Sequence, residues 1–338
     1  MNPGVWLSAT LAIIGGALQG GFAVPMKYAR KWNHENIWLV FVLAGLLVFP
    51  WILTVATVPS LVEVYRAASP ASLALIAACG IGWGVGATLV GIAFRMLGIG
   101  LGFAIVLGLS ALLGSLVPFL IQSREISNLQ GRLYLLGTCV MLVGIALVSV
   151  AGSMRERAAQ QAGGSSDTGG KPFAVGLLIA IAAGVLSSLL SDAIAFTSPM
   201  VDAARQLGAS SVWASNVVLA PTTTGGSFAN FIYCILMMRR NGSVRLFWQP
   251  SVASHWVYGI AMGAFWYGGL TFYSLGEQKI GSVEGWPLFI GAMILSSSAA
   301  GFLTGEWTSA GRGAKLILCA GSLLIFSALI VVGMAHSW

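Results

Sequence analysis

The sequence predicts an all-α membrane protein whose ten transmembrane helices form two inverted five-helix repeats. Hydrophobic residues make up 57% of the 338 residues and charged residues only 8%, which excludes an ordinary soluble domain. Apolar stretches long enough to cross a bilayer recur along the whole chain. The third observation is a weak internal repeat, in which the same four residue types recur at identical spacing: Gly91, Phe94, Leu97 and Gly98, then Gly269, Phe272, Leu275 and Gly276.

Ten apolar segments, separated by short polar or charged loops, are the expected spans. They cover residues 5–25, 37–58, 71–95, 99–121, 132–152, 173–198, 211–238, 253–275, 282–303 and 314–335. The first segment has no basic region before it and no small-residue cleavage site after it, so we expect it to remain as a helix. Glycines run through the third and fourth spans, where small residues let helix backbones approach closely.

A polar tract rich in glycine and serine divides the chain. Residues 153–171 have no apolar period, which predicts a flexible linker between a first repeat, 1–152, and a second, 172–338. Each repeat then holds five spans. An odd number reverses the orientation of the second repeat, which is the inverted arrangement of many transporters.

The distribution of basic residues predicts the orientation in the membrane. Twelve of the 17 lysines and arginines follow odd-numbered spans, and the other five follow even-numbered spans. Since lysine and arginine collect on cytoplasmic loops, the linker is expected inside and both termini outside. The same residues are scattered over short loops and form no continuous basic patch, so no nucleic-acid partner is expected.

Three stretches carry a resemblance to a known family. They are PMKYARKWNHENIW at Pro25–Trp38, the glycine-rich stretch Trp83–Pro118, and GEWTSAGR at Gly305–Arg312. Together they resemble the L-rhamnose–proton symporter family of the drug/metabolite transporter superfamily. The resemblance implies alternating-access import of L-rhamnose, or a related neutral hexose or deoxyhexose, with a proton across the bacterial inner membrane. It implies no cofactor besides the coupling ion H⁺.

Two acidic residues lie within apolar runs, and this sequence alone suggests them as proton-coupling groups. Asp192 and Glu284 are both expected in the outer half of the membrane, whereas the other acids, Glu277 among them, fall in predicted loops or at span ends. An ionised aspartate at a helix centre costs at least about 2.5 kcal/mol on insertion scales, so such groups usually face a polar cavity or a partner. For Glu284 the alternative is the exposed beginning of a helix, where an acid favours the helix dipole.

A sugar site needs polar groups for the hydroxyls and flat apolar surfaces for the ring. The residues with that chemistry at membrane depth are Gln19, Trp83, Asn216, Trp266, Tyr267, Tyr273 and Trp286. Interhelical hydrogen bonds and ordinary packing are the alternative roles for these side chains. Lys27 and Arg95 are placed for gating contacts at the cytoplasmic side, and the alternative for both is a loop cation whose stem extends along the helix end.

The rival classes fit less well. The chain has no HExxH, GxSxG or Walker motif, so neither an enzyme nor a metal site is predicted. Drug/metabolite exporters typically have an acid in the first helix, and the first span here has none. A nucleotide-sugar exchanger would need cations deep in its cavity to bind phosphate, whereas these cations lie near the span edges. Uptake of a neutral sugar is therefore preferred, and the oligomeric state stays open.

Overall fold

A computed structural model describes residues 3–97, 99–121, 128–161, 173–308 and 310–335. Within these ranges the chain consists of helices joined by turns and contains no strand, as predicted for an all-α membrane protein. Among the described residues, seven helical segments are long and apolar enough to cross a bilayer. The protein is thus a multi-pass membrane protein.

The first half of the chain ends with the longest uninterrupted helix. Its elements are α1 (Pro3–Gly21), η1 (Val24–Tyr28), α2 (His34–Val42), η2 (Leu43–Val48), α3 (Phe49–Thr57), α4 (Leu61–Ala67), α5 (Pro70–Leu97), α6 (Ile99–Ile121) and α7 (Leu129–Gln161). The π-helical turn η2 ends two residues before Pro50, which has no backbone N–H to donate to the preceding turn. α7 runs on to Gln161, into the predicted linker, because MRERAAQQ contains no helix breaker. The remaining linker residues lie outside the described ranges.

The second half begins at α8 and contains a sharp reversal. Its elements are α8 (Phe173–Phe196), α9 (Ser198–Gln206), α10 (Asn216–Asn241), η3 (Ser243–Trp248), α11 (Ala253–Leu303) and α12 (Arg312–Ala335). Gly281 interrupts α11 with a positive φ of 76°, a backbone conformation that glycine adopts at little cost.

The two arms of α11 fold back on each other at Gly281. In a continuous helix residues 277 and 285 would be about 12 Å apart along the axis. Here a Cβ atom on Gly285 would lie only 3.4 Å from the Cβ atom of Glu277. The first arm continues to the turn, so the placement of Glu277 in a loop was wrong. No proline separates Glu277 from Gly281, and the helix ends only where the backbone reverses.

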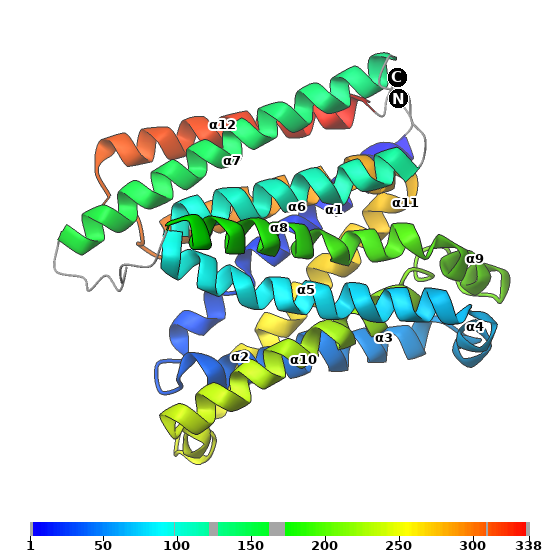
Figure 1. The fold of residues 1–338 in the computed structure, drawn as a ribbon, viewed down its shortest axis with the longest axis horizontal. Helices are drawn as coiled ribbons and strands as arrows, with labels where there is room; N and C mark the ends of the chain where they lie inside the picture. Colours follow the sequence, from blue (N-terminus) through cyan, green and yellow to red (C-terminus); the bar gives the residue numbers. More distant parts are fainter. Residues whose placement is uncertain (1–2, 98, 122–127, 162–172, 309, 336–338) are drawn as a thin grey trace.

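Helices that are distant in sequence pack against each other. α1 runs along α11, α7 along α12, and α8 between α5 and α6, while α10 contacts α5 and α2 (Figure 1). The α1–α11 contact is close because it is made by glycines. A Cβ atom on Gly15 would lie 2.5 Å from the carbonyl oxygen of Gly269, and one on Gly269 would lie 2.6 Å from that of Gly15.

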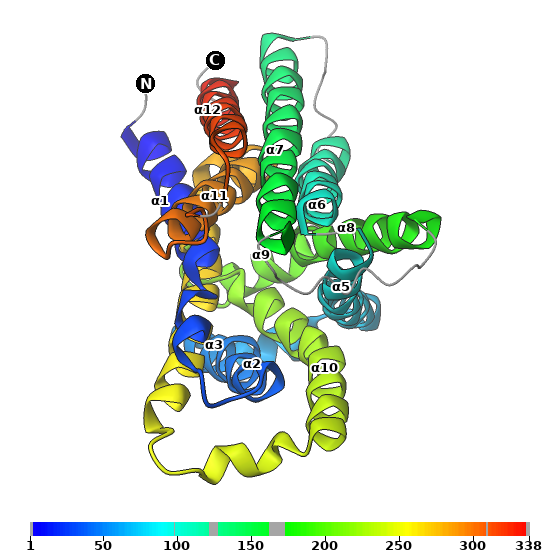
Figure 2. The ribbon, with the colours of Figure 1, turned by 90° about the vertical axis from the view of Figure 1, so that its left-hand side faces the viewer.

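The bundle has two distinct ends. In Figure 1 both chain termini lie near one end, where α4 and α9 are also found. The turns η1 and η3 and the connection from α11 to α12 lie at the opposite end, which faces the viewer in Figure 2. In that view the chain from α10 through η3 to α11 passes below α2 and α3. We call the end with the chain termini the α9 end and the opposite end the η1 end.

Candidate functional site

Asp192 lies near the last turn of α8 and is only 2% exposed. Its Oδ2 atom accepts a hydrogen bond of 2.9 Å from the hydroxyl of Ser188, one turn earlier in the same helix. Its Oδ1 atom is buried and has no hydrogen-bond partner among the described residues. Since buried polar atoms are normally satisfied, this carboxyl group has capacity for a ligand, a water molecule or a proton.

Tyr273, on the first arm of α11, lies near this carboxyl group, and Trp286, on the second arm, packs against Tyr273. The Tyr273 ring is fully buried, contacts the Trp286 ring edge-on at 5.3 Å between centroids, and interacts electrostatically with Asp192. Two hydrogen bonds to carbonyl oxygens of α6 hold the surrounding helices. Trp286 Nε1 donates to Ser110 at 3.0 Å, and the Ser191 hydroxyl donates to Gly114 at 3.1 Å.

Glu277 is the residue that sequence reasoning missed at this site. It lies one turn after Tyr273 on the first arm of α11, and it interacts electrostatically with the Tyr273 phenol. Its Oε2 atom is inaccessible and has no hydrogen-bond partner among the described residues. The spacing of Trp266, Tyr273 and Glu277 at helical period was the available signal. We call Asp192, Tyr273, Glu277 and Trp286 the acid cluster.

A second group of candidates meets farther along α11, about 10 Å from Tyr273 by helical rise. The ring of Trp83 on α5 packs against that of Trp266 on α11, with centroids 5.4 Å apart and planes at 35°. Gln19 on α1 is 7% exposed and donates through Nε2 to the carbonyl oxygen of Trp266 at 3.3 Å. We call Trp83, Trp266 and Gln19 the tryptophan pair group. It joins three helices through one polar and two flat apolar side chains.

Asn216 and Tyr267 do not join either group through a hydrogen bond in the described structure. Asn216 begins α10 and donates from its side-chain amide to the Thr57 hydroxyl at 3.3 Å, while its main-chain carbonyl oxygen accepts from the Thr54 hydroxyl at 3.4 Å. Tyr267 is 3% exposed and lies beside Thr54. The side chains of Glu284 and Arg95 lie outside the described residues.

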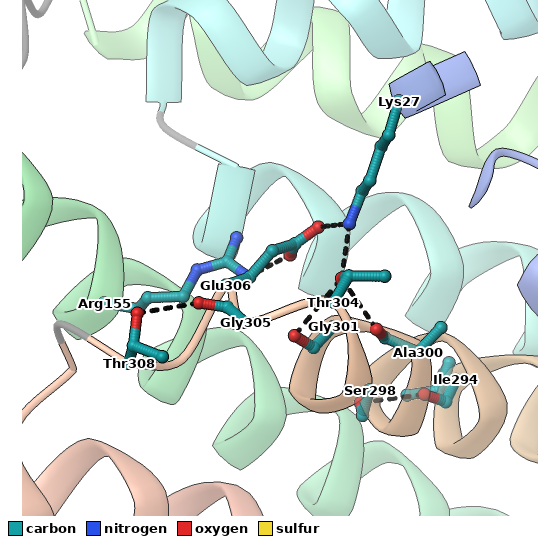
Figure 3. Close-up of polar contacts among 10 residues, drawn as sticks. All are labelled: Lys27, Arg155, Ile294, Ser298, Ala300, Gly301, Thr304, Gly305, Glu306 and Thr308. Carbon is teal, nitrogen blue, oxygen red and sulfur yellow. Dashed lines mark hydrogen bonds and ion pairs between the residues drawn. The ribbon is translucent and has the colours of Figure 1, made fainter. Parts of the chain in front are cut away.

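At the η1 end, three charged side chains meet in what we call the ion-pair cluster (Figure 3). Glu306, in the turn between α11 and α12, forms an ion pair with Lys27 of η1 and a second one, at 2.6 Å, with Arg155 of α7. Lys27 also donates to the Thr304 hydroxyl at 2.6 Å, and the Arg155 guanidinium lies 5.1 Å from the Trp307 ring centroid. The predicted gating residue Lys27 therefore joins η1 to the α11–α12 turn.

The two cations decide the ionisation of Glu306. Partial burial alone would raise the pKa of Glu306, but hydrogen bonds from Lys27 and Arg155, together with their positive charges, outweigh it and hold that pKa below the usual glutamate value. The carboxylate is therefore ionised at neutral pH, and both ion pairs are formed.

An apolar pocket of about 530 Å³ lies apart from these groups. It is formed by α1, the second arm of α11 and α12, and almost all of its lining is apolar. None of its lining residues belongs to the acid cluster or the tryptophan pair group. Such a surface offers no partners for sugar hydroxyls, so we do not place the substrate there.

Comparison with known proteins decides the family. The model of the L-rhamnose-proton symport protein family matches residues 1–337. The chain belongs to the L-rhamnose–proton symport protein family. The resemblance predicted from three stretches of sequence is thereby confirmed for that family. Symport moves two solutes together and converts neither, so the family consists of transporters and not enzymes.

Individual members of the L-rhamnose–proton symport protein family are similar over their whole length. L-rhamnose-proton symporters of Yersinia pestis (strain Pestoides F) and Yersinia pseudotuberculosis serotype O:1b (strain IP 31758) are each 28% identical over 347 residues, covering 99% of both chains. A solved structure described only as "Crystal structure of protein" has a TM-score of 0.53 at 16% identity, over 98% of this chain and 99% of its own. That likeness shows a shared fold.

Proposed function

We propose that this chain carries L-rhamnose, or a closely related neutral deoxyhexose, together with a proton by alternating access. The observation that carries the proposal is the family match over residues 1–337. The relatives bear the name L-rhamnose-proton symporter, which gives no support to the exporter and nucleotide-sugar alternatives. The coupling ion is H⁺, and no further cofactor is required.

Asp192 is the proposed coupling residue. Its carboxyl group is 2% exposed and receives one hydrogen bond, from Ser188, without a cation at the site among the described residues. An unpaired ionised carboxylate in such surroundings costs several kcal/mol. A bound proton removes that cost, so closure of the protein around the site is favoured when Asp192 is protonated. Glu284 stays a sequence-based candidate for the same role.

The tryptophan pair group is the proposed platform for the sugar ring. The flat faces of Trp83 and Trp266 suit the C–H surface of a deoxyhexose, and the Gln19 amide can exchange its 3.3 Å bond to Trp266 for a sugar hydroxyl. Tyr273 and Trp286 extend this surface toward Asp192. Asn216 and Tyr267 are assigned a supporting role, since they lie around Thr54.

The proposed architecture is ten crossing helices in two inverted repeats, as in the drug/metabolite transporter superfamily. The helix contacts support it, because they come in matching pairs. α1 packs on the two arms of α11, while α8, five spans later, packs on α5 and α6. α7 and α12, the last helix of each half, pack on each other. In the proposed orientation the η1 end is cytoplasmic and the α9 end, with both termini, faces the periplasm of a bacterial inner membrane.

The ion-pair cluster is the proposed cytoplasmic gate. It joins η1, α7 and the α11–α12 turn through Lys27, Arg155 and Glu306. Release of sugar at this end requires that these side chains separate. Arg95, which precedes the connection from α5 to α6, is proposed as a further gating cation.

The decisive experiment uses purified protein in liposomes with a pH-sensitive dye inside. L-Rhamnose added outside should drive proton uptake, and D-glucose should drive less or none. Asp192→Asn is expected to abolish proton-driven accumulation while retaining exchange of labelled rhamnose for unlabelled rhamnose. Full accumulation by Asp192→Asn would remove that residue from coupling, and absence of rhamnose-dependent proton uptake by the unmodified protein would refute the proposed function.

A further inference from the structure

The acid cluster contains more unsatisfied polar atoms than one coupling carboxyl group explains. Asp192 Oδ1, the Tyr273 hydroxyl and Glu277 Oε2 are all inaccessible, and none makes a hydrogen bond of standard geometry with a described residue. The Tyr273 hydroxyl and the Glu277 carboxyl group interact at a longer range than such a bond. The three atoms come from two helices, α8 and the first arm of α11, and all lie toward the α9 end: Asp192 and Glu277 about one turn from it and Tyr273 about two turns. Three unsatisfied polar atoms around the Tyr273 ring indicate a site whose missing hydrogen bonds are supplied by bound protons or by the hydroxyl groups of a ligand.

The two carboxyl groups are linked through Tyr273. The Tyr273 phenol interacts electrostatically with both, and the carboxyl groups are on opposite helices. The apolar rings of Trp286 and Phe289, 5.3 and 5.0 Å from the Tyr273 ring, keep the local dielectric constant low, so an ionised carboxyl group beside the Tyr273 ring is costly. The pair is therefore most stable with at least one proton bound.

Few charged or titratable groups face Asp192 and Glu277. Among the described residues, the Cys79 thiol on α5 interacts with Asp192, and Arg205 on α9 interacts with Glu277. The guanidinium of Arg205 is already paired with Asp202 at 2.9 Å, and both side chains are largely exposed. Glu277 therefore has a distant, screened cation on the α9 side, while Asp192 has none among its described contacts.

We propose that Glu277 is a second coupling carboxyl group, which shares its proton with Asp192 through the Tyr273 hydroxyl. Once hydrogen-bonded to both groups, the phenol oxygen accepts the proton of the protonated carboxyl group while its own O–H proton passes to the other carboxylate; one O–H bond breaks and one forms at the phenol, which ends as a neutral hydroxyl. This inference rests on the proposed function, since it assigns a further residue to proton-coupled transport.

Rhamnose-induced proton uptake and rhamnose exchange, measured on the full chain in liposomes, test the proposal. Glu277→Gln is expected to retain exchange and to lose rhamnose-induced proton uptake, down to the level of protein-free liposomes. The matched control is Glu63→Gln, because Glu63 is an exposed glutamate on α4 at the same end of the bundle. That control is expected to show the proton uptake of the unmodified protein.

Two further results separate the possible failures. Wild-type proton uptake and an unchanged pH profile in Glu277→Gln would overturn the role of Glu277 and leave the proposed function intact. If Glu277→Gln loses exchange as well, Glu277→Asp decides. Retention of coupled uptake with a shifted pH profile supports a coupling role, whereas equal loss of exchange and coupling in both variants shows a structural role only. Absence of rhamnose-driven uptake by the unmodified protein would refute the proposed function itself.

Discussion

Glu306→Gln isolates the contribution of the ion-pair cluster, because it keeps the size of the side chain and removes its charge. Lys27 and Glu306 are each 37% exposed and Arg155 is 22% exposed, so water screens both ion pairs. Screened pairs of this kind stabilise by about 0.2–1 kcal/mol each. Loss of both therefore amounts to about 0.4–2 kcal/mol, or about a 2- to 30-fold rise in the open fraction of the η1 end.

Hydrogen–deuterium exchange measures this opening at the site itself. The amide N–H of Glu306 donates to Gly301 at 2.9 Å and that of Thr304 donates to Ala300 at 2.9 Å, so both report on the α11–α12 turn. Peptides covering residues 300–308 should exchange about 2- to 30-fold faster in Glu306→Gln. Asp202→Asn is the control, because it breaks an exposed ion pair at the α9 end.

The outcome discriminates between a gate and a fortuitous surface contact. Unchanged exchange over residues 300–308 in Glu306→Gln would refute the energetic role of the ion-pair cluster. An equal increase in Asp202→Asn would show that any lost surface charge loosens the bundle, and that result would refute it too.

Three other predictions follow from the same geometry. Gly15→Leu should lower the melting temperature in detergent by several degrees, because its side chain would collide with the carbonyl oxygen of Gly269, already 2.5 Å from an ideal Cβ. Trp266→Ala should weaken rhamnose binding about 2- to 13-fold in a binding titration, since ring contacts contribute about 0.5–1.5 kcal/mol beyond area burial. The control is Trp248→Ala, which should bind as the unmodified protein does because the Trp248 side chain is 77% exposed. The pKa of Glu306 is lowered, so the stability that its ion pairs contribute is complete above pH 4.5, the ordinary glutamate pKa, and is lost as the pH falls through the lowered pKa. Melting temperatures of the unmodified protein and of Glu306→Gln, measured over a pH series, should therefore converge only below pH 4.5.

Hydropathy predicted the helical class and the long apolar helices well, because apolar length is a local property. The boundaries between closely spaced spans were harder. Residues 276–281 carry glycines and charges that suggest a loop, yet the helix continues to Ile280 and reverses at one residue. A reversal that needs a single positive φ leaves little trace in composition, so Glu277 was assigned to the wrong kind of structure.

The candidate site was only partly predictable for a related reason. Asp192 stood out because a lone acid in an apolar run is unusual. Its proximity to Tyr273 depends on how α8 and α11 pack, and helix periodicity contains no information about partners. Asn216 has suitable chemistry, but its amide is used by Thr57, which a sequence cannot reveal.

The pairing of α1 with α11 has a consequence for biosynthesis. Gln19 and its partner Trp266 are separated by 247 positions, so α1 enters the membrane long before the helix that covers its glycine face has been made. At about 5–20 residues per second, the ribosome needs about 12–50 s to supply that partner. During this interval the exposed glycines of α1 must be shielded by lipid or by an insertion chaperone. The N-terminal segment thus reaches its native neighbours only when synthesis is nearly complete.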